Sequence, residues 1–191
     1  GRIVSIDFVC FEFKMVLAHF GIPCRVDDVY GYHSDRSDAT RDDVKTSLIA
    51  AVYGGPPSFT DDYDDLYTKI QEFVDGAVAT LCVQYLGREV HYKTAGDARR
   101  AFSHLIQFRS TVLFTLFVST ILQEITSQAV DAEVIATIYD ELVIDCHVDY
   151  LLVIENIARD AAKSIFEQDN VSLVPRIRYG PNFGLLKHEL T

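Results

Sequence analysis

Apolar residues in the first part of the chain recur at the spacings of a strand and of an amphipathic helix. Residues 3–8 form a short apolar run with an acid near its end, which predicts a buried strand. Residues 12–20 repeat apolar side chains at three- and four-residue steps, which predicts a helix that Gly21 ends. The polar stretch 22–38 shows neither spacing, so we expect it to be irregular.

The middle of the chain is predicted to be mostly helical. A helix over 40–53 begins at Thr40, which with Asp43 resembles a capping box, and it stops at the glycines and prolines of 54–57. The other elements expected here are a helix at 61–83, a hairpin or connector at 87–92, and a helical stretch at 97–128 whose apolar second half should be buried.

The last third of the chain predicts a hairpin that carries acids. Residues 133–139 and 142–146 are rich in β-branched and apolar residues and are separated by Asp140 and Glu141, so both acids should lie at the tip. The elements expected to follow are a helix at 149–168 and a strand at 171–178. This order predicts an α+β fold in which helices pack against one face of an antiparallel sheet.

Composition limits the class of protein. The 191 residues are 49% hydrophobic, enough for one sizeable core shared by at most two subdomains. The longest apolar stretch, 112–122, is too short to cross a bilayer, and no signal peptide is recognisable, so we expect no membrane association. The net charge of −11 argues against a protein that grips nucleic acid by its overall charge, although many acids lie in the runs 35–43 and 61–65.

The four cysteines are scattered and form no CxxC pair. This pattern fits a reduced, intracellular protein better than a disulfide scaffold or a zinc site. We therefore expect core thiols at Cys10, Cys24, Cys82 and Cys146.

The acids at strand ends suggest metal chemistry. Asp7 closes the first strand, and Asp140 and Glu141 lie between the two strands of the hairpin. Mg²⁺ prefers carboxylate oxygens, and two such ions can activate a hydroxyl and stabilise a leaving pyrophosphate. The alternative is that Asp7 caps the following helix and that the acidic pair is a solvated turn.

One face of the helix at 40–53 combines cations with an apolar patch. Arg41, Lys45, Ile49 and Tyr53 recur at four-residue steps. A triphosphate could lie along this face, with its charge near the cations. The alternative is an ordinary surface helix.

Together these segments resemble family A DNA polymerases over nearly the whole chain. SIDFVCFEFKMVLAHFG is similar to motif A, with Asp7 and Glu12 in the places of its metal-binding Asp and its Glu. RDDVKTSLIAAVYGG resembles motif B, TIYDELVID resembles motif C, and VPRIRYGPNFGLLKHE resembles the tail of bacterial DNA polymerase I. The motif B positions are Arg41, Lys45, Tyr53 and Gly54.

The resemblance implies a division into subdomains and an activity. Residues 1–21 and 97–191 would form a palm with an antiparallel sheet, and 22–96 a helical fingers subdomain that includes a motif B helix at 40–55. The implied reaction is template-directed DNA synthesis by two-metal nucleotidyl transfer from a dNTP to a primer 3′-hydroxyl, as the catalytic part of a larger or split polymerase.

The resemblance also implies roles for single residues. Two Mg²⁺ ions, or Mn²⁺, would be bound by Asp7, Asp140 and the carbonyl of Phe8, with Glu141 in support. The nucleotide would be held by Arg41, Lys45, Ile49, Tyr53 and Glu12; Lys45 would protonate the leaving pyrophosphate, and Glu12 with Tyr53 would exclude a 2′-hydroxyl. The DNA contacts would come from Arg99, Ser103, Gln107 and Tyr139.

Some positions depart from the family pattern. Ile49 stands where the family has an aromatic residue, Ser103 replaces an Asn, and Tyr139 replaces a His. In the family the thumb subdomain precedes motif A in the chain. The resemblance therefore implies that this chain binds primer-template DNA and dNTPs, and that another chain or an N-terminal segment supplies the thumb. Two alternatives stay open: a catalytically silent polymerase-like scaffold, and a fragment of a single-subunit RNA polymerase, against which Glu12 argues.

Overall fold

The computed structural model describes residues 1–24, 26–53, 55, 64–186 and 188–189. The chain divides into two compact units: unit 1 comprises residues 1–11 and 112–191, and unit 2 comprises residues 12–111. The assignment of a palm to 1–21 and 97–191 and of fingers to 22–96 stays a prediction. Gly54 and most of the predicted stop at 54–57 lie outside the described residues, as do residues 61–63 of the predicted helix 61–83.

Unit 1 is built on a five-stranded antiparallel sheet of order β4-β5-β1-β6-β7. Its strands are β1 (Arg2–Phe8), β4 (Ala132–Ile138), β5 (Glu141–Cys146), β6 (Pro175–Gly180) and β7 (His188–Glu189). The helical elements of this unit are the C-terminal part of α6 (Ala101–Ser127), η1 (Val148–Tyr150), α7 (Leu151–Gln168) and η2 (Phe183–Leu185). The α+β class with helices packed on an antiparallel sheet is confirmed.

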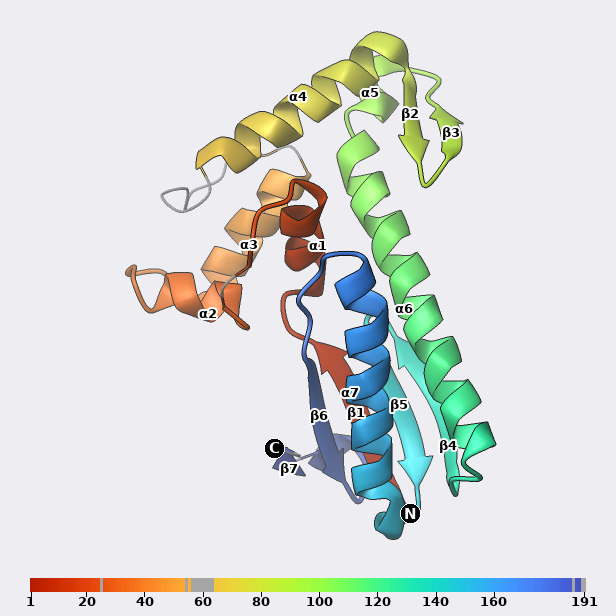
Figure 1. Cartoon of the computed structure of the whole chain (residues 1–191). Coiled ribbons are helices and arrows are strands. Elements are labelled where there is room, and N and C mark those ends of the chain that lie inside the picture. The colour runs from red at the N-terminus through yellow and green to blue at the C-terminus, as the bar shows by residue number, and fades with distance from the viewer. Residues whose placement is uncertain (25, 54, 56–63, 187, 190–191) are drawn as a thin grey trace. The chain divides into compact units, whose positions relative to one another are not determined.

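The alternation of side chains along β1 gives the sheet its two different faces. Val4, Ile6 and Phe8 are almost fully buried and point to the face that α6 and α7 cover (Figure 1). Phe8 packs edge-on against Phe117 of α6 and Phe166 of α7, with 4.9 Å between ring centroids in each pair. The intervening residues of β1 point to the opposite face, which α6 and α7 do not cover (Figure 1).

Unit 2 is mainly helical. Its elements are α1 (Phe11–His19), α2 (Val29–Ser34), α3 (Arg41–Val52), α4 (Asp64–Thr80), β2 (Cys82–Tyr85), β3 (Arg88–His91), α5 (Ala95–Ala98) and the first part of α6. Phe102 of α6 is fully buried, where it stacks on Phe20 at 5.4 Å and meets Phe73 of α4 edge-on at 5.4 Å. This aromatic cluster joins α4 and α6 within unit 2.

Two local signals in the sequence are confirmed at atomic level. Thr40 and Asp43 form a reciprocal capping box at the start of α3, since the side chain of each accepts the backbone N–H of the other. Gly21 has a φ of +66° and ends α1, because its N–H and that of Ile22 donate to carbonyls of the last helical turn.

Several boundaries differ from the prediction. The stretch 22–38 contains the short helix α2, which Asp28 caps by accepting the N–H of Gly31. The helix predicted to reach residue 83 ends at Thr80, and the chain turns at Leu81, with a φ of +52°, into β2. The stretch 97–128 is interrupted between α5 and α6, and the strand predicted at 171–178 begins at Pro175.

The acidic hairpin is present, and its tip lies one residue earlier than predicted. Ile138 pairs with Glu141, so the two loop residues are Tyr139 and Asp140, and Glu141 is the first residue of β5. The cause is that β4 ends before Tyr139, whose φ of +56° turns the chain.

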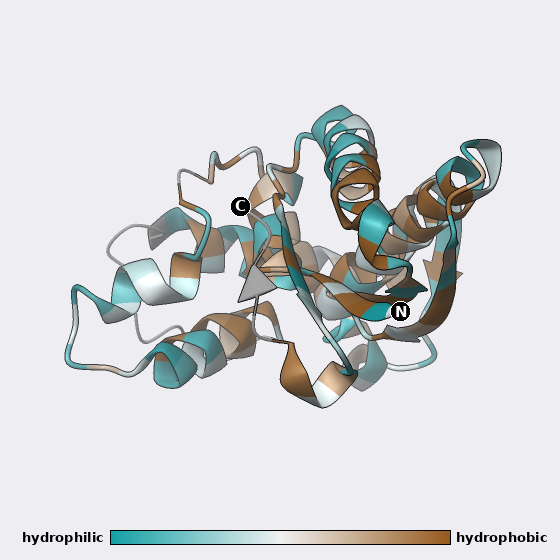
Figure 2. Cartoon of the chain, turned by 90° about the horizontal axis from the view of Figure 1, so that it is seen from below, coloured by the Kyte–Doolittle hydropathy of each residue, from teal (hydrophilic) through white to brown (hydrophobic). Residues whose placement is uncertain are grey.

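One helix among the described residues, α6, is long and apolar enough to span a membrane by length and composition alone. A core helix meets the same test, and Phe117 and Ile121 of α6 are fully buried in unit 1. The prediction that its whole second half would be buried is wrong, since Leu116 and Leu122 are 50% and 44% exposed. Figure 2 shows apolar residues in brown along the strands near the N-terminus.

We expect Phe117→Ala to lower the free energy of unfolding by about 3–5 kcal/mol, because it leaves a cavity between Phe8 and Phe166. The matched control is Leu116→Ala in the same turn of α6, where the half-exposed side chain should cost far less, about 0.5 kcal/mol. Urea unfolding followed by circular dichroism measures both. Equal losses in the two variants would contradict this account of the core.

Candidate active site

The open face of the sheet in unit 1 carries a cluster of carboxylates and arginines. Asp7 of β1 lies opposite Arg176 of β6, whose Nε and Nη2 donate to its two carboxylate oxygens at 3.0 and 2.6 Å. Arg178 lies between the acids: its Nη2 is 4.0 Å from Oδ2 of Asp7 and 3.7 Å from Oε1 of Glu141. Two of the predicted site residues, Asp7 and Glu141, therefore share one cation.

The register of the sheet explains why these acids meet. Ile6 pairs with Leu142, and one further step along the two strands sets Asp7 opposite Glu141. Glu141 also accepts a hydrogen bond from the hydroxyl of Ser5, which is fully buried on β1. The side chains of both acids are largely shielded, with exposed fractions of 18% and 19%.

Tyr139 and Asp140 lie at the tip of the hairpin, where Tyr139 is exposed and Asp140 is half-buried. Tyr139 is 96% exposed and has a φ of +56°, a conformation that costs an aromatic residue about 1–3 kcal/mol. The exposed side chain of Tyr139 adds nothing to a core that could compensate for this unfavourable φ. Such outliers gather at functional sites.

Arg176 and Arg178 were not among the site residues expected from the sequence. The available signal is the alternation PRIRYG, which places both arginines on one face of a strand. The sequence could not show that this strand pairs with β1, because the paired residues are 169 positions apart.

The donor atoms of the acids suit a hard divalent cation. Asp7, Asp140 and Glu141 offer carboxylate oxygens, and the carbonyl of Phe8 follows directly on β1. Mg²⁺ takes one or two protein carboxylates and completes its shell with water or phosphate. Within the described part of the chain, the three acids do not bring three donor atoms within 4.8 Å of one another. The metal assignment of Asp7, Phe8 and Asp140 stays a prediction.

In unit 2 the structure joins three predicted residues from distant parts of the sequence. Tyr53, the C-cap of α3, donates its hydroxyl to Oε1 of Glu12 on α1 at 3.3 Å. The amide of Gln107 on α6 donates to the same hydroxyl at 2.6 Å. The Tyr53 side chain is thereby fixed from two sides while the residue stays 50% exposed.

The surroundings of Tyr53 alter its acidity. Partial burial raises the pKa of the Tyr53 phenol, and the negative charge of Glu12 and the hydrogen bond to it raise this pKa further. The hydrogen bond from Gln107 acts in the opposite direction and lowers the pKa. The phenol is therefore a stable donor to Glu12 at neutral pH.

The predicted nucleotide-binding face of α3 is exposed at its cationic end. Arg41 holds Asp28 through its Nε and Nη2, at 2.8 and 3.2 Å, and both side chains are close to half exposed. Lys45 is exposed, and no described carboxylate lies within ion-pair distance of it. Ile49 is half-buried, while Val44 and Leu48 on the other side of the helix are buried.

The predicted DNA-contacting residues occupy different environments. Arg99 is exposed in the break before α6, and Gln107 is exposed on that helix. Ser103 is buried, and its hydroxyl donates to the carbonyl of Arg100 at 2.9 Å. Their contacts with DNA stay a prediction.

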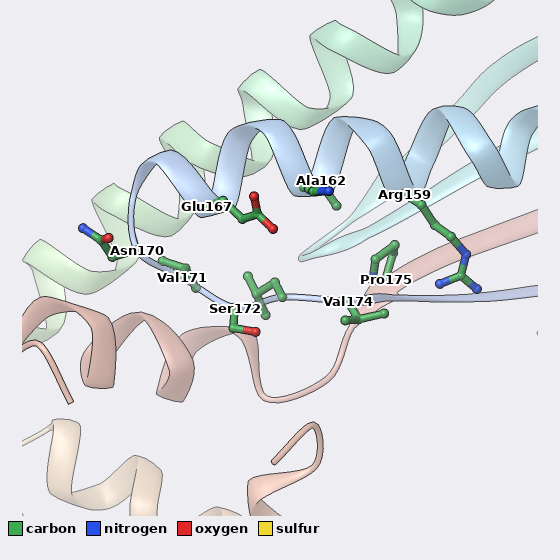
Figure 3. Close-up of a pocket in the computed structure, with 10 residues that line it drawn as sticks. Arg159, Ala162, Glu167, Asn170, Val171, Ser172, Val174 and Pro175 are labelled. Carbon is green, nitrogen blue, oxygen red and sulfur yellow. The ribbon is translucent and has the colours of Figure 1, made fainter. Parts of the chain in front are cut away.

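A pocket of about 540 Å³ lies beside α7 in unit 1 (Figure 3). Arg159, Lys163 and Glu167 line it from the helix, and residues 170–175 line it from the following segment. Arg159 already forms an ion pair with Glu155 at 2.8 Å. None of the predicted site residues lines this pocket, so it is separate from the carboxylate cluster.

Comparison with known proteins supports the fold. No family model and no protein with a curated description matches the chain. Among solved structures, the chain is similar to the POL domain of Pol1 from M. smegmatis, determined in complex with DNA primer-template and dNTP. The TM-score is 0.71 at 14% sequence identity, and the match covers 98% of this chain and 41% of that one. The chain thus has the α+β fold of a polymerase domain and spans less than half the length of that structure.

The two hydrogen bonds of Tyr53 should be separable by titration. Glu12→Gln removes a negative charge and should lower the pKa of Tyr53, whereas Gln107→Ala removes a donor and should raise it. Both are measured by NMR of the tyrosine ring carbons over a pH series, with Tyr53→Phe to assign the signal. Shifts of the same sign in the two variants would contradict the cluster.

Proposed function

We propose that the chain is the palm and fingers portion of a template-directed DNA polymerase. It would transfer a nucleotidyl group from a dNTP to a primer 3′-hydroxyl as the catalytic part of a larger or split enzyme. The fold it shares with a polymerase domain supports this proposal. The observation that carries it is the cluster of Glu12, Tyr53 and Gln107, because these positions belong to the segments that resemble motif A, motif B and the primer-facing helix.

The carboxylates of unit 1 would hold the metals. We assign Asp7, Asp140 and the carbonyl of Phe8 as ligands of two Mg²⁺ ions, with Mn²⁺ as a substitute, and Glu141 as their support. When bound, the ions would activate the primer hydroxyl and stabilise the leaving pyrophosphate. Arg176 would have to release Asp7 first, and the half-exposed guanidinium has room to turn away.

The exposed face of α3 would receive the triphosphate. Lys45 is exposed and has no described carboxylate partner, so it could approach phosphate oxygens directly, and it would protonate the leaving pyrophosphate. Arg41 would exchange Asp28 for the triphosphate, since an exposed ion pair contributes little stability. Ile49 would pack beside the nucleotide without the aromatic plane of the family.

Glu12 and Tyr53 would select the sugar. A hydrogen bond from Tyr53 holds the carboxylate of Glu12, which would then collide with a 2′-hydroxyl. Exclusion of the 2′-hydroxyl would favour DNA over RNA synthesis. The primer-template would be contacted by Arg99, Ser103, Gln107 and Tyr139, and the thumb would come from another chain or a preceding segment.

The second candidate function is a polymerase-like scaffold without activity. The observation that favours it is the bidentate pair of Asp7 with Arg176, because a carboxylate already neutralised by a guanidinium needs no metal ion. The net charge of −11 is also unfavourable for a protein that would grip DNA by itself.

We expect Asp140→Asn to lower single-nucleotide primer extension by roughly 10³-fold or more, because the lost stabilisation amounts to several kcal/mol. Asp145→Asn, which removes an exposed acid from β5, is the control and should leave extension unchanged. The assay uses Mg²⁺ and the chain, alone and with any co-purifying partner.

The assay also separates the two candidate functions. Extension by the parent protein that survives in Asp140→Asn would show that the metal assignment is wrong. A folded parent protein that extends no primer, even with its partner, would favour the scaffold.

A second prediction concerns the sugar. Glu12→Ala should reduce the preference for deoxynucleotides over ribonucleotides by about tenfold or more, because the space beside the 2′ carbon opens. Glu12→Gln keeps the bulk of the side chain and should retain the preference. The measurement is the ratio of kcat/KM for the two nucleotides, and an unchanged ratio in Glu12→Ala would refute the selecting role.

A further inference from the structure

The hairpin of β2 and β3 in unit 2 has a regular geometry and contains none of the proposed active-site residues. Its two-residue loop, Leu86 and Gly87, has φ angles of +45° and +78°, which match the twist of a tight hairpin. The register sets Cys82 opposite His91. At its base, Thr80 donates its hydroxyl to the carbonyl of Cys82 at 2.8 Å.

The two faces of this hairpin have different chemistry. Tyr85 on one face is buried and donates its hydroxyl to the carbonyl of Ala101 at 2.6 Å, which ties the hairpin to α6. Side chains on the opposite face alternate with Tyr85. They are Cys82, Gln84, Glu89 and His91, of which Cys82 is half-buried and the other three are exposed.

Three metal-ligating groups converge on this second face. One ligand atom each from Cys82, Glu89 and His91 lies within 4.8 Å of the other two. Nε2 of His91 is 3.5 Å from Oε2 of Glu89. Zinc bonds of about 2.0–2.3 Å in a tetrahedral arrangement set ligand atoms about 3.3–3.8 Å apart. The His91–Glu89 separation already has this value, and the thiol needs only a small movement.

We propose that Cys82, Glu89 and His91 form a Zn²⁺ site. A thiolate, an imidazole and a carboxylate together suit a borderline-soft ion such as Zn²⁺, unlike the all-oxygen donors of unit 1, which suit Mg²⁺. Gln84 donates to the other oxygen of Glu89 at 3.5 Å and so orients its carboxylate. Three protein ligands leave a fourth position for water or another group.

The environment of Cys82 differs from the one predicted from the cysteine pattern. Cys82 was expected to be a core thiol, yet it lies half-buried on a polar strand face, beside two ligand types. The sequence signal was weak because the ligands come from two strands, and no CxxC or HxxxH spacing marks them. Zn²⁺ binding at this hairpin does not depend on polymerase activity.

The test uses Co²⁺ as a spectroscopic probe of the reduced, metal-free protein. Binding at this site should produce a thiolate-to-cobalt charge-transfer band, which carboxylates such as Asp7 and Asp140 cannot produce. Zn²⁺ in excess should remove the band, and it should raise the Tm of the parent protein, because it binds the folded state.

Single substitutions identify the thiol that produces the charge-transfer band. Cys82→Ser should abolish it, whereas Cys24→Ser, at a half-buried thiol elsewhere in unit 2, should keep it. His91→Ala and Glu89→Gln should weaken Co²⁺ binding by at least about tenfold, since even an outer-shell partner contributes roughly 10–100-fold. A missing band, a band retained in Cys82→Ser, or unchanged affinity in both other variants would overturn the proposal.

Discussion

The alternation of β1 is the constraint on which the chemistry of unit 1 depends. Val4, Ile6 and Phe8 must face α6 and α7 to bury their apolar surface, and this requirement turns Ser5 and Asp7 to the open face. The aromatic contacts of Phe8 with both helices hold the strand in this orientation. The position of the acid is therefore fixed by packing on the opposite side of the sheet and not by the polar residues around it.

Local signals predicted local structure well, and they failed where the outcome depends on distant residues. The capping box of Thr40 and the stop at Gly21 are visible in a few residues, and both occur as expected. The turn at Leu81 was invisible because a leucine, and not a glycine, adopts the left-handed conformation. Arg176 was missed because its partner on β1 is defined only by strand pairing across the chain.

The local distribution of charge in this protein differs from its net charge. The chain is strongly acidic, yet the carboxylates of the open sheet face are matched by Arg176 and Arg178, and α3 exposes Lys45. Interactions between exposed charges more than about 8 Å apart are largely screened at physiological salt, so nearby charges dominate. A phosphate group close to α3 would respond to that helix more than to the net charge of the chain.

The tight loop at Tyr139 and Asp140 has a consequence for how the chain tolerates change in its length. A loop of two residues is the shortest common connection between antiparallel strands, so it fixes the pairing of Ile138 with Glu141. A residue inserted or deleted between Glu141 and Leu142 would exchange the two faces of the rest of β5. Leu142 would then point to the open side and an acid would enter the apolar interior, so this strand admits substitutions far more readily than insertions or deletions.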